Sequence, residues 1–175
     1  KGMPAGPQML GIIAAKHVGA PVKLVLTRQQ MYGPVGHRGQ TRQTLRLGMT
    51  DDGRLSAIDH HTLASTSRFD DFVEPASNAS HTLYAARGIR TTHAAARIDI
   101  GTPMFMRAPG EASGSAALES AIDEAALAAR MDPLDFRLQN YAEVEPISGK
   151  PFSSKALREC YAQGAERFGW AKRPL

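Results

Sequence analysis

Residues 102–112 read TPMFMRAPGEA and carry the chain from an extended segment into an alanine-rich helix. The sequence predicts that a strand delivers Met106 and Arg107 to a turn at Pro109-Gly110, and that a helix begins at Glu111. Free backbone N–H groups at a helix start bind anions, and Arg107 adds a permanent cation with a planar donor fork. An oxyanion, a phosphate or a metal-oxo group would fit there. An ordinary strand-to-helix turn with a surface arginine is the alternative, and the local pattern alone favours it.

Working outward from this segment, residues 89–100 predict an extended strand, and residues 111–130 predict a long helix. Small and apolar side chains fall on one stripe of that helix: Leu118, Ile122, Ala125 and Ala129. Small residues on the stripe would allow close approach to a sheet or to another helix.

A β-hairpin is predicted upstream. Residues 41–50 alternate, with three apolar side chains on one face: Leu45, Leu47 and Met49. Asp51-Asp52-Gly53 forms a tight turn, and residues 54–65 return as the partner strand. Residues 66–80 read as an irregular connection. Together these elements predict a mixed α/β fold, a sheet with packed helices.

The first residues predict a helix followed by a strand. Residues 7–19 read as a buried helix, because they are almost entirely apolar and end at Gly19. Residues 22–27 then read as a short apolar strand, which would complete an αβ unit. The glycine-rich loop at residues 33–39 does not follow the phosphate-loop or dinucleotide-binding fingerprints.

The last residues predict further helices. Asp132 is placed as an N-cap and Pro133 at the first helical position, with Leu134 and Leu138 on the buried side. Residues 143–150 read as a linker. Ser153 or Ser154 is predicted to cap a final helix that ends near residue 168. The predicted domains are residues 1–142 and residues 143–175.

Composition excludes several classes of function. A single cysteine, Cys160, excludes an internal disulfide, a zinc finger or an iron–sulfur site made by this chain. The formal net charge is only +4 and aromatic residues make up 6%, so a nucleic-acid surface with stacking side chains is not indicated. No apolar run approaches the ~20 residues that a membrane-spanning helix needs.

Histidines and paired acids offer other candidate sites. His60 and His61 are neighbours on a predicted strand, so they point to opposite faces and do not share a metal. The remaining histidines show no ligand spacing, and only His37-Arg38 is kept as a possible site contact.

Two further residue types are weighed as sites. Glu119 and Asp123 stand one helical turn apart and are interpreted as a solvated face rather than an acid–base pair. Cys160 has no evident base beside it, so it is interpreted as a packed thiol rather than a nucleophile.

Residues 102–112 resemble the molybdenum-binding large subunit of the xanthine dehydrogenase and aldehyde oxidase family. Within that family the chain looks most like the bacterial periplasmic aldehyde oxidase type. The resemblance covers nearly the whole chain. Other segments that carry it are residues 21–28 with Met31, residues 36–38, residues 70–75, residues 132–140 and residues 151–170.

The resemblance implies a partial molybdopterin-binding domain. Residues 1–142 would be the C-terminal part of a first such domain, and residues 143–175 would be the linker and the first helix of a second one. The cofactor would be molybdopterin, usually as a cytosine dinucleotide in bacteria, with molybdenum. Aldehydes or N-heterocycles would be hydroxylated with oxygen from water, and electrons would leave through [2Fe–2S] clusters and FAD on partner subunits or domains. The residues implied at the cofactor are Phe105, Met106, Arg107 and Gly110, with Pro109 on the substrate side.

Departures from the family pattern limit these expectations. The loop beside the metal would end at Lys1, the carboxylate of the purine enzymes would fall at Gly2, and their substrate arginine would fall near Pro75. Missing purine-clamping groups argue against xanthine as substrate. The general-base glutamate would lie beyond Leu175, and no metal ligand is expected here.

These departures make the chain an expected internal fragment of the large subunit, a view that an opening without an initiator methionine also favours. The compartment stays open between bacterial cytoplasm and periplasm. The alternative is a non-catalytic scaffold or binding module that keeps part of the fold.

Overall fold

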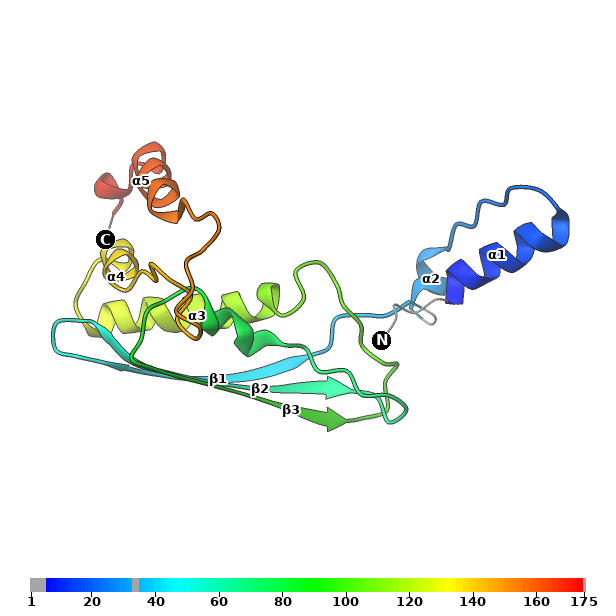
Figure 1. Cartoon of the computed structure of the whole chain (residues 1–175), viewed down its shortest axis with the longest axis horizontal. Coiled ribbons are helices and arrows are strands. Elements are labelled where there is room, and N and C mark those ends of the chain that lie inside the picture. The colour runs from blue at the N-terminus through cyan, green and yellow to red at the C-terminus, as the bar shows by residue number, and fades with distance from the viewer. Residues whose placement is uncertain (1–5, 33–34, 175) are drawn as a thin grey trace. The chain divides into compact units, whose positions relative to one another are not determined.

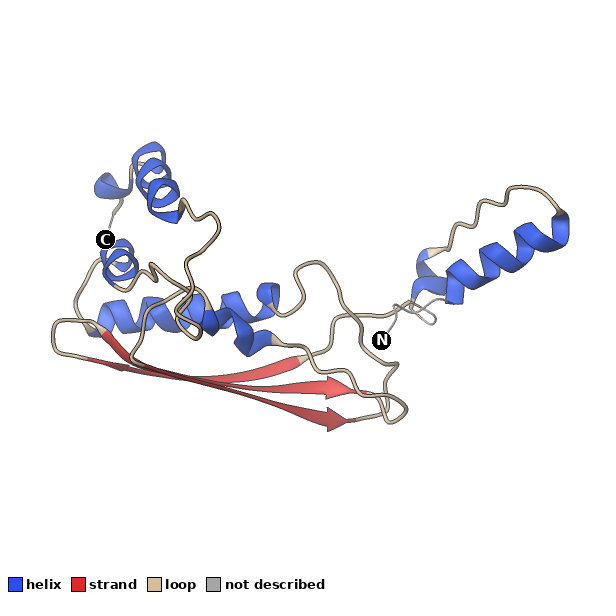
Figure 2. Cartoon of the chain, in the orientation of Figure 1, coloured by secondary structure: helices blue, strands red, loops and turns tan. Residues whose placement is uncertain are grey.

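A three-stranded mixed sheet runs through the molecule, whose computed structural model describes residues 6–32 and 35–174. Its strands are β1 (Thr41–Met49), β2 (Leu55–Thr66) and β3 (Gly88–Arg97), in the order β1-β2-β3 (Figure 2). The turn between β1 and β2 is the predicted one, with Gly53 at a φ of 80° and its N–H donating to the Thr50 carbonyl.

β2 and β3 run in the same direction. Asp59 of β2 meets Arg90 of β3, and further along His61 meets Thr92. The connection between them contains the short helix η1 (Ala76–His81). A parallel neighbour requires a crossover of this kind, which explains why residues 66–80 do not form a hairpin.

The main core lies where α3 (Glu111–Ala128) packs on the sheet. It joins the predicted stripe of α3 to β2 and to the next helix, and its buried members are Leu55, Ile58, Ala79, Tyr84, Leu118, Ile122, Ala125, Ala126 and Phe136. The alanines allow the helix to approach closely, as predicted. Burial of each large apolar side chain contributes roughly 1.5–3 kcal/mol.

Two predictions about the first residues are wrong. The helix α1 (Gly6–Val18) forms, but none of its residues is buried. Residues 21–27 are extended without joining the sheet, so the predicted strand is absent among the described residues. They lead instead to the short helix α2 (Arg28–Met31), which Thr27 caps with a capping box.

The later helices follow the sequence in part. Asp132 caps α4 (Pro133–Gln139) as predicted, accepting from the N–H of Leu134 at 2.8 Å. However, the buried residue of α4 is Phe136, whereas Leu134 and Leu138 are half-buried. The helix α5 (Leu157–Phe168) has no side-chain cap, so the prediction for Ser153 or Ser154 is wrong. A last short helix, η2, covers Trp170–Lys172.

The chain divides into two compact units, and the strands and α3 contribute residues to both. The first unit takes the described residues up to Thr44, His61–Asn78 and Thr91–Ser115; the second takes Leu45–His60, Ala79–Arg90 and the residues from Ala116 onward. The core lies in the second unit and the Arg107 turn in the first. Of the helices labelled in Figure 1, α1 belongs to the first unit and α5 to the second. None of the described helices is long and apolar enough to cross a membrane.

Candidate functional site

The turn at residues 107–110 sits between an extended segment and α3, as the sequence predicts. Ala108 and Gly110 both have positive φ, at 53° and 77°. A side chain at Gly110 would place its Cβ 2.5 Å from the carbonyl oxygen of Pro75. The turn therefore lies directly against the backbone of the segment that follows β2.

Two segments that are distant in the sequence contact this turn: the loop before β1 and the segment after β2. The loop before β1 brings His37, whose carbonyl accepts from the N–H of Met104 at 2.9 Å. Arg38 of the same loop donates to the carbonyl oxygens of Arg107 and Ala108. The segment after β2 brings Glu74. His37-Arg38, kept from the sequence as a possible contact, thus belongs to the site.

Glu74 is the buried centre of this meeting point. Glu74 is fully buried. Its Oε1 accepts a hydrogen bond from Nη1 of Arg38 at 2.5 Å and another from the N–H of Gly110 at 2.8 Å. The hydroxyl of Ser113 donates to the same oxygen at 3.4 Å. Oε2 is buried with no hydrogen-bond partner among the described residues. The carboxylate thus joins the loop before β1 to the first turn of α3.

The Arg107 side chain is available to a ligand. The residue is exposed, and within residues 6–32 and 35–174 its guanidinium forms no ion pair or hydrogen bond. Its backbone is nevertheless held, because its carbonyl accepts from Arg38. An unpaired cation on a fixed turn is the donor that an anionic cofactor needs, so the residues present fit such a group.

The other predicted cofactor residues lie beside Arg107. Phe105 is 57% exposed and meets Phe72 edge-on, with ring centroids 5.0 Å apart. Met106 and Pro109 are exposed. Gly110 differs from the expectation of a free N–H, because its N–H donates to Glu74. Its contribution is the close approach of its backbone.

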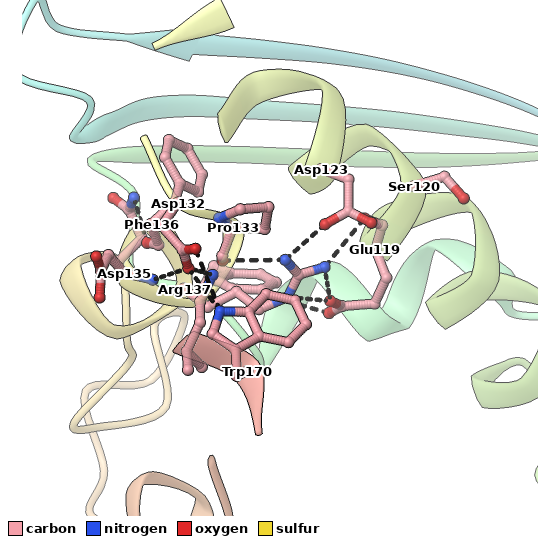
Figure 3. Close-up of polar contacts among 12 residues, drawn as sticks. Glu119, Ser120, Asp123, Asp132, Pro133, Asp135, Phe136, Arg137 and Trp170 are labelled. Carbon is pink, nitrogen blue, oxygen red and sulfur yellow. Dashed lines mark hydrogen bonds and ion pairs between the residues drawn. The ribbon is translucent and has the colours of Figure 1, made fainter. Parts of the chain in front are cut away.

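A second polar cluster in the other unit is satisfied internally. Arg137 donates to Glu119 at 2.8 Å and to Asp123 at 2.7 Å (Figure 3). The Tyr84 hydroxyl also donates to Glu119, at 2.7 Å. Burial raises the pKa of Tyr84, and the Glu119 carboxylate raises it further. The predicted solvated face is therefore an ion-paired one. Cys160 is exposed, contrary to the packed thiol that was predicted.

The histidines behave as the strand pattern predicts. His60 is buried and shares a hydrogen bond with Ser80, whereas His61 is exposed and shares one with Thr92. In the described part of the chain, no group of three or more histidine, cysteine, aspartate or glutamate side chains is placed to hold a metal ion.

Sequence reasoning missed Glu74 and Ser113. Glu74 stands in a polar connection beside two aspartates, where nothing distinguishes a buried carboxylate from a solvated one. No local signal marks its burial, since acidic side chains are mostly exposed unless they are paired.

Known proteins resemble this chain along most of its length. A family model described as the molybdopterin cofactor-binding domain matches residues 1–141. The aldehyde oxidoreductase molybdenum-binding subunit PaoC of Escherichia coli K12 is 39% identical over 166 residues, which cover 94% of this chain and 22% of that subunit. The putative xanthine dehydrogenase molybdenum-binding subunit XdhA of the same organism is 27% identical over 179 residues, 94% of this chain and 23% of that subunit.

Solved structures share the fold. Quinoline 2-oxidoreductase from Pseudomonas putida 86 matches with a TM-score of 0.74 at 20% identity, over 93% of this chain and 22% of that one. The aldehyde oxidoreductase of Desulfovibrio gigas matches with a TM-score of 0.70 at 23% identity, over 91% and 18%. The chain spans about a fifth of the length of the curated relatives it matches. The chain therefore belongs to the molybdopterin cofactor-binding domain family, and it is similar over most of its length to part of the molybdenum-binding subunits of aldehyde oxidoreductase and xanthine dehydrogenase.

Proposed function

We propose that this chain forms part of the active site of a molybdenum hydroxylase that oxidises aldehydes or N-heterocycles. The observation that carries the proposal is the exposed guanidinium of Arg107, which has no partner among the described residues and stands on a turn whose backbone is held by Arg38 and Glu74. An aldehyde is the favoured substrate, because the chain is more similar to an aldehyde oxidoreductase subunit than to a xanthine dehydrogenase subunit.

In this proposal Arg107 binds the anionic end of molybdopterin, which in bacteria would be the cytosine dinucleotide form. Phe105 and Met106 would line the approach to the cofactor, and Gly110 would keep the turn in place by packing closely against the Pro75 backbone. Pro109 would face the substrate. A fixed cation favours negative charge that develops during the reaction, since it needs no reorganisation at that moment.

The rest of the chemistry would come from outside these residues. When bound, the cofactor would supply two-electron oxidation with oxygen taken from water. The general-base glutamate would come from the remainder of the large subunit. An iron–sulfur subunit with [2Fe–2S] clusters and an FAD subunit would receive the electrons. We also propose the domain boundary near residue 142, which the end of the family match at residue 141 supports.

Replacement of the arginine tests the proposal. In the natively purified complex, Arg107→Ala should lower the molybdenum content and the turnover by roughly tenfold or more, because hydrogen bonds to charged groups are worth about 1.5–3 kcal/mol. Arg68→Ala is the matched control, since Arg68 pairs with Asp99 at the surface of the same unit. Unchanged molybdenum and turnover in Arg107→Ala would contradict the proposed role.

The second candidate is a non-catalytic scaffold or binding module. It is considered because the general-base glutamate that the family resemblance implies would not lie within this chain. It predicts a native protein without bound molybdenum. Metal analysis of the purified complex separates the two: molybdenum together with product oxygen that carries the label of ¹⁸O-water supports the hydroxylase, and the absence of both supports the scaffold.

A further inference from the structure

The contacts of Glu74 are concentrated on one feature, the turn that presents Arg107. The N–H of Gly110 and the hydroxyl of Ser113 donate to Oε1 from the end of the turn and the first turn of α3. Arg38 donates to the same oxygen from the other side at 2.5 Å. Every described hydrogen bond of this carboxylate therefore comes from the turn, from the first turn of α3 or from Arg38.

Arg38 connects Glu74 to the backbone of Arg107 by hydrogen bonds. One of its terminal nitrogens donates to the carbonyl of Arg107 and the other to the carbonyl of Ala108, at 3.4 Å, as well as to Glu74. The planar guanidinium can hold these acceptors together, whereas the single ammonium of a lysine cannot. The Glu74–Arg38 pair thus brackets the backbone of the turn from residue 107 to residue 110.

Stability alone does not account for a carboxylate in this place. A buried ion pair loses hydration that its mutual attraction only partly replaces, so apolar side chains often stabilise such a position better. Oε2 makes no hydrogen bond within the described chain, which adds to that cost. Retention of a buried charge at a unique geometry is a known means of fixing one conformation over others.

The turn needs fixing from outside because its backbone is unfavourable by itself. Ala108 has a φ of 53°, a conformation that side chains rarely adopt. Such backbone persists only when its surroundings determine it, and it is concentrated at ligand-binding sites. Without Glu74 and Arg38, the peptide groups on both sides of Arg107 would be free to relax.

We infer that Glu74 is a positioning residue, which acts through Arg38 and the N–H of Gly110 to hold the backbone that presents the Arg107 guanidinium toward the anionic cofactor. The inference rests on the proposed function for the identity of that anion. It assigns to the buried carboxylate a role in the geometry of the cofactor site and not in proton transfer.

Glu74→Gln in the natively purified complex is the test, because glutamine keeps the shape and removes the charge. Amide hydrogen exchange at residues 107–113 should become roughly tenfold faster, since a charged acceptor of the Gly110 N–H is lost. Turnover per bound molybdenum should fall roughly tenfold with little change in KM, as for other residues behind a metal site. The Mo(V) electron paramagnetic resonance signal should shift or broaden.

The matched control is Asp71→Asn, which removes the partner of Arg97 three residues earlier on the same segment and should change none of these properties. Unchanged exchange at residues 107–113 would overturn the inference whatever the molybdenum content. Faster exchange with unchanged turnover per molybdenum and an unchanged spectrum would also overturn it, because Glu74 would then be structural only. Wild-type complex without molybdenum would refute the proposed function, and with it the role of Glu74 toward a cofactor.

Discussion

Gly110 brings the turn of the candidate site close to the backbone of the segment after β2. We expect Gly110→Ala to destabilise the protein by about 2–5 kcal/mol, the sum of a left-handed conformation for a non-glycine residue and of overpacking. The added Cβ would lie 2.5 Å from the Pro75 carbonyl oxygen, which belongs to backbone and cannot move aside cheaply. Thermal melting of the purified complex measures the effect.

Gly19→Ala provides the comparison for that prediction. Gly19 has a similar φ of 67°, but nothing lies within 4 Å of its added Cβ, so only the conformational cost of about 1–2 kcal/mol applies. Equal losses in the two variants would show that the contact with Pro75 does not constrain the turn.

Single residues of the site differ in how far the sequence reveals them. Arg107 and Gly110 stand in a local strand–turn–helix pattern, so their place at the turn was predictable from neighbours in the chain. Glu74 could not be found this way. Its burial depends on Arg38, which is 36 residues earlier, and on Gly110, which is 36 residues later.

At the scale of elements, α4 depends on its N-cap. Burial alone would raise the pKa of Asp132, but hydrogen bonds from Arg173, Trp170 and the N–H groups of Leu134 and Asp135 lower the pKa to about 2. A pKa below the ordinary 3.8 means that the contribution to stability is present above about pH 4 and is lost as the pH falls toward 2. Partial exposure of the side chain limits this contribution to about 1 kcal/mol.

This pH dependence should be visible in α4 itself. Amide protection of Leu134 and Asp135 should fall about fivefold between pH 4 and pH 2 in the wild type. Asp132→Asn keeps a good N-cap without a titrating group, so its protection should change much less over the same range. A wild-type profile as flat as that of the asparagine variant would contradict the assignment.

Elements with a clear local period were predictable, and those decided by packing were not. The alternation of residues 41–50 and the apolar stripe of α3 fixed β1 and the core helix. Residues 22–27 are as apolar as a typical strand, yet no described strand pairs with them. Strand propensity alone does not make a strand, because it depends on packing against neighbouring strands. Likewise the choice of Phe136 over Leu134 as the buried side chain of α4 depends on where the sheet lies.

At the scale of the whole molecule, the described chain leaves the apolar side chains of α1 in solvent. Its large apolar residues are between 49% and 65% exposed: Met9, Leu10, Ile12, Ile13 and Val18. A contiguous apolar surface of this kind marks an interface. The curated relatives are several times longer, so the remainder of a subunit would offer surface to cover it.

We therefore expect the 175-residue polypeptide, expressed on its own, to associate in solution and to bind the dye ANS. Burial of each leucine or isoleucine side chain contributes roughly 1.5–3 kcal/mol, so burial of several together is enough to drive association. Leu10→Lys combined with Ile13→Lys should restore a monomer, because residues three apart share a helix face. Phe69→Ser is the control: Phe69 is 92% exposed but does not belong to α1, and its loss should leave association unchanged. Light scattering coupled to size-exclusion chromatography measures the oligomeric state. A monomer of the unaltered sequence that does not bind ANS would contradict the prediction that the apolar surface of α1 drives association.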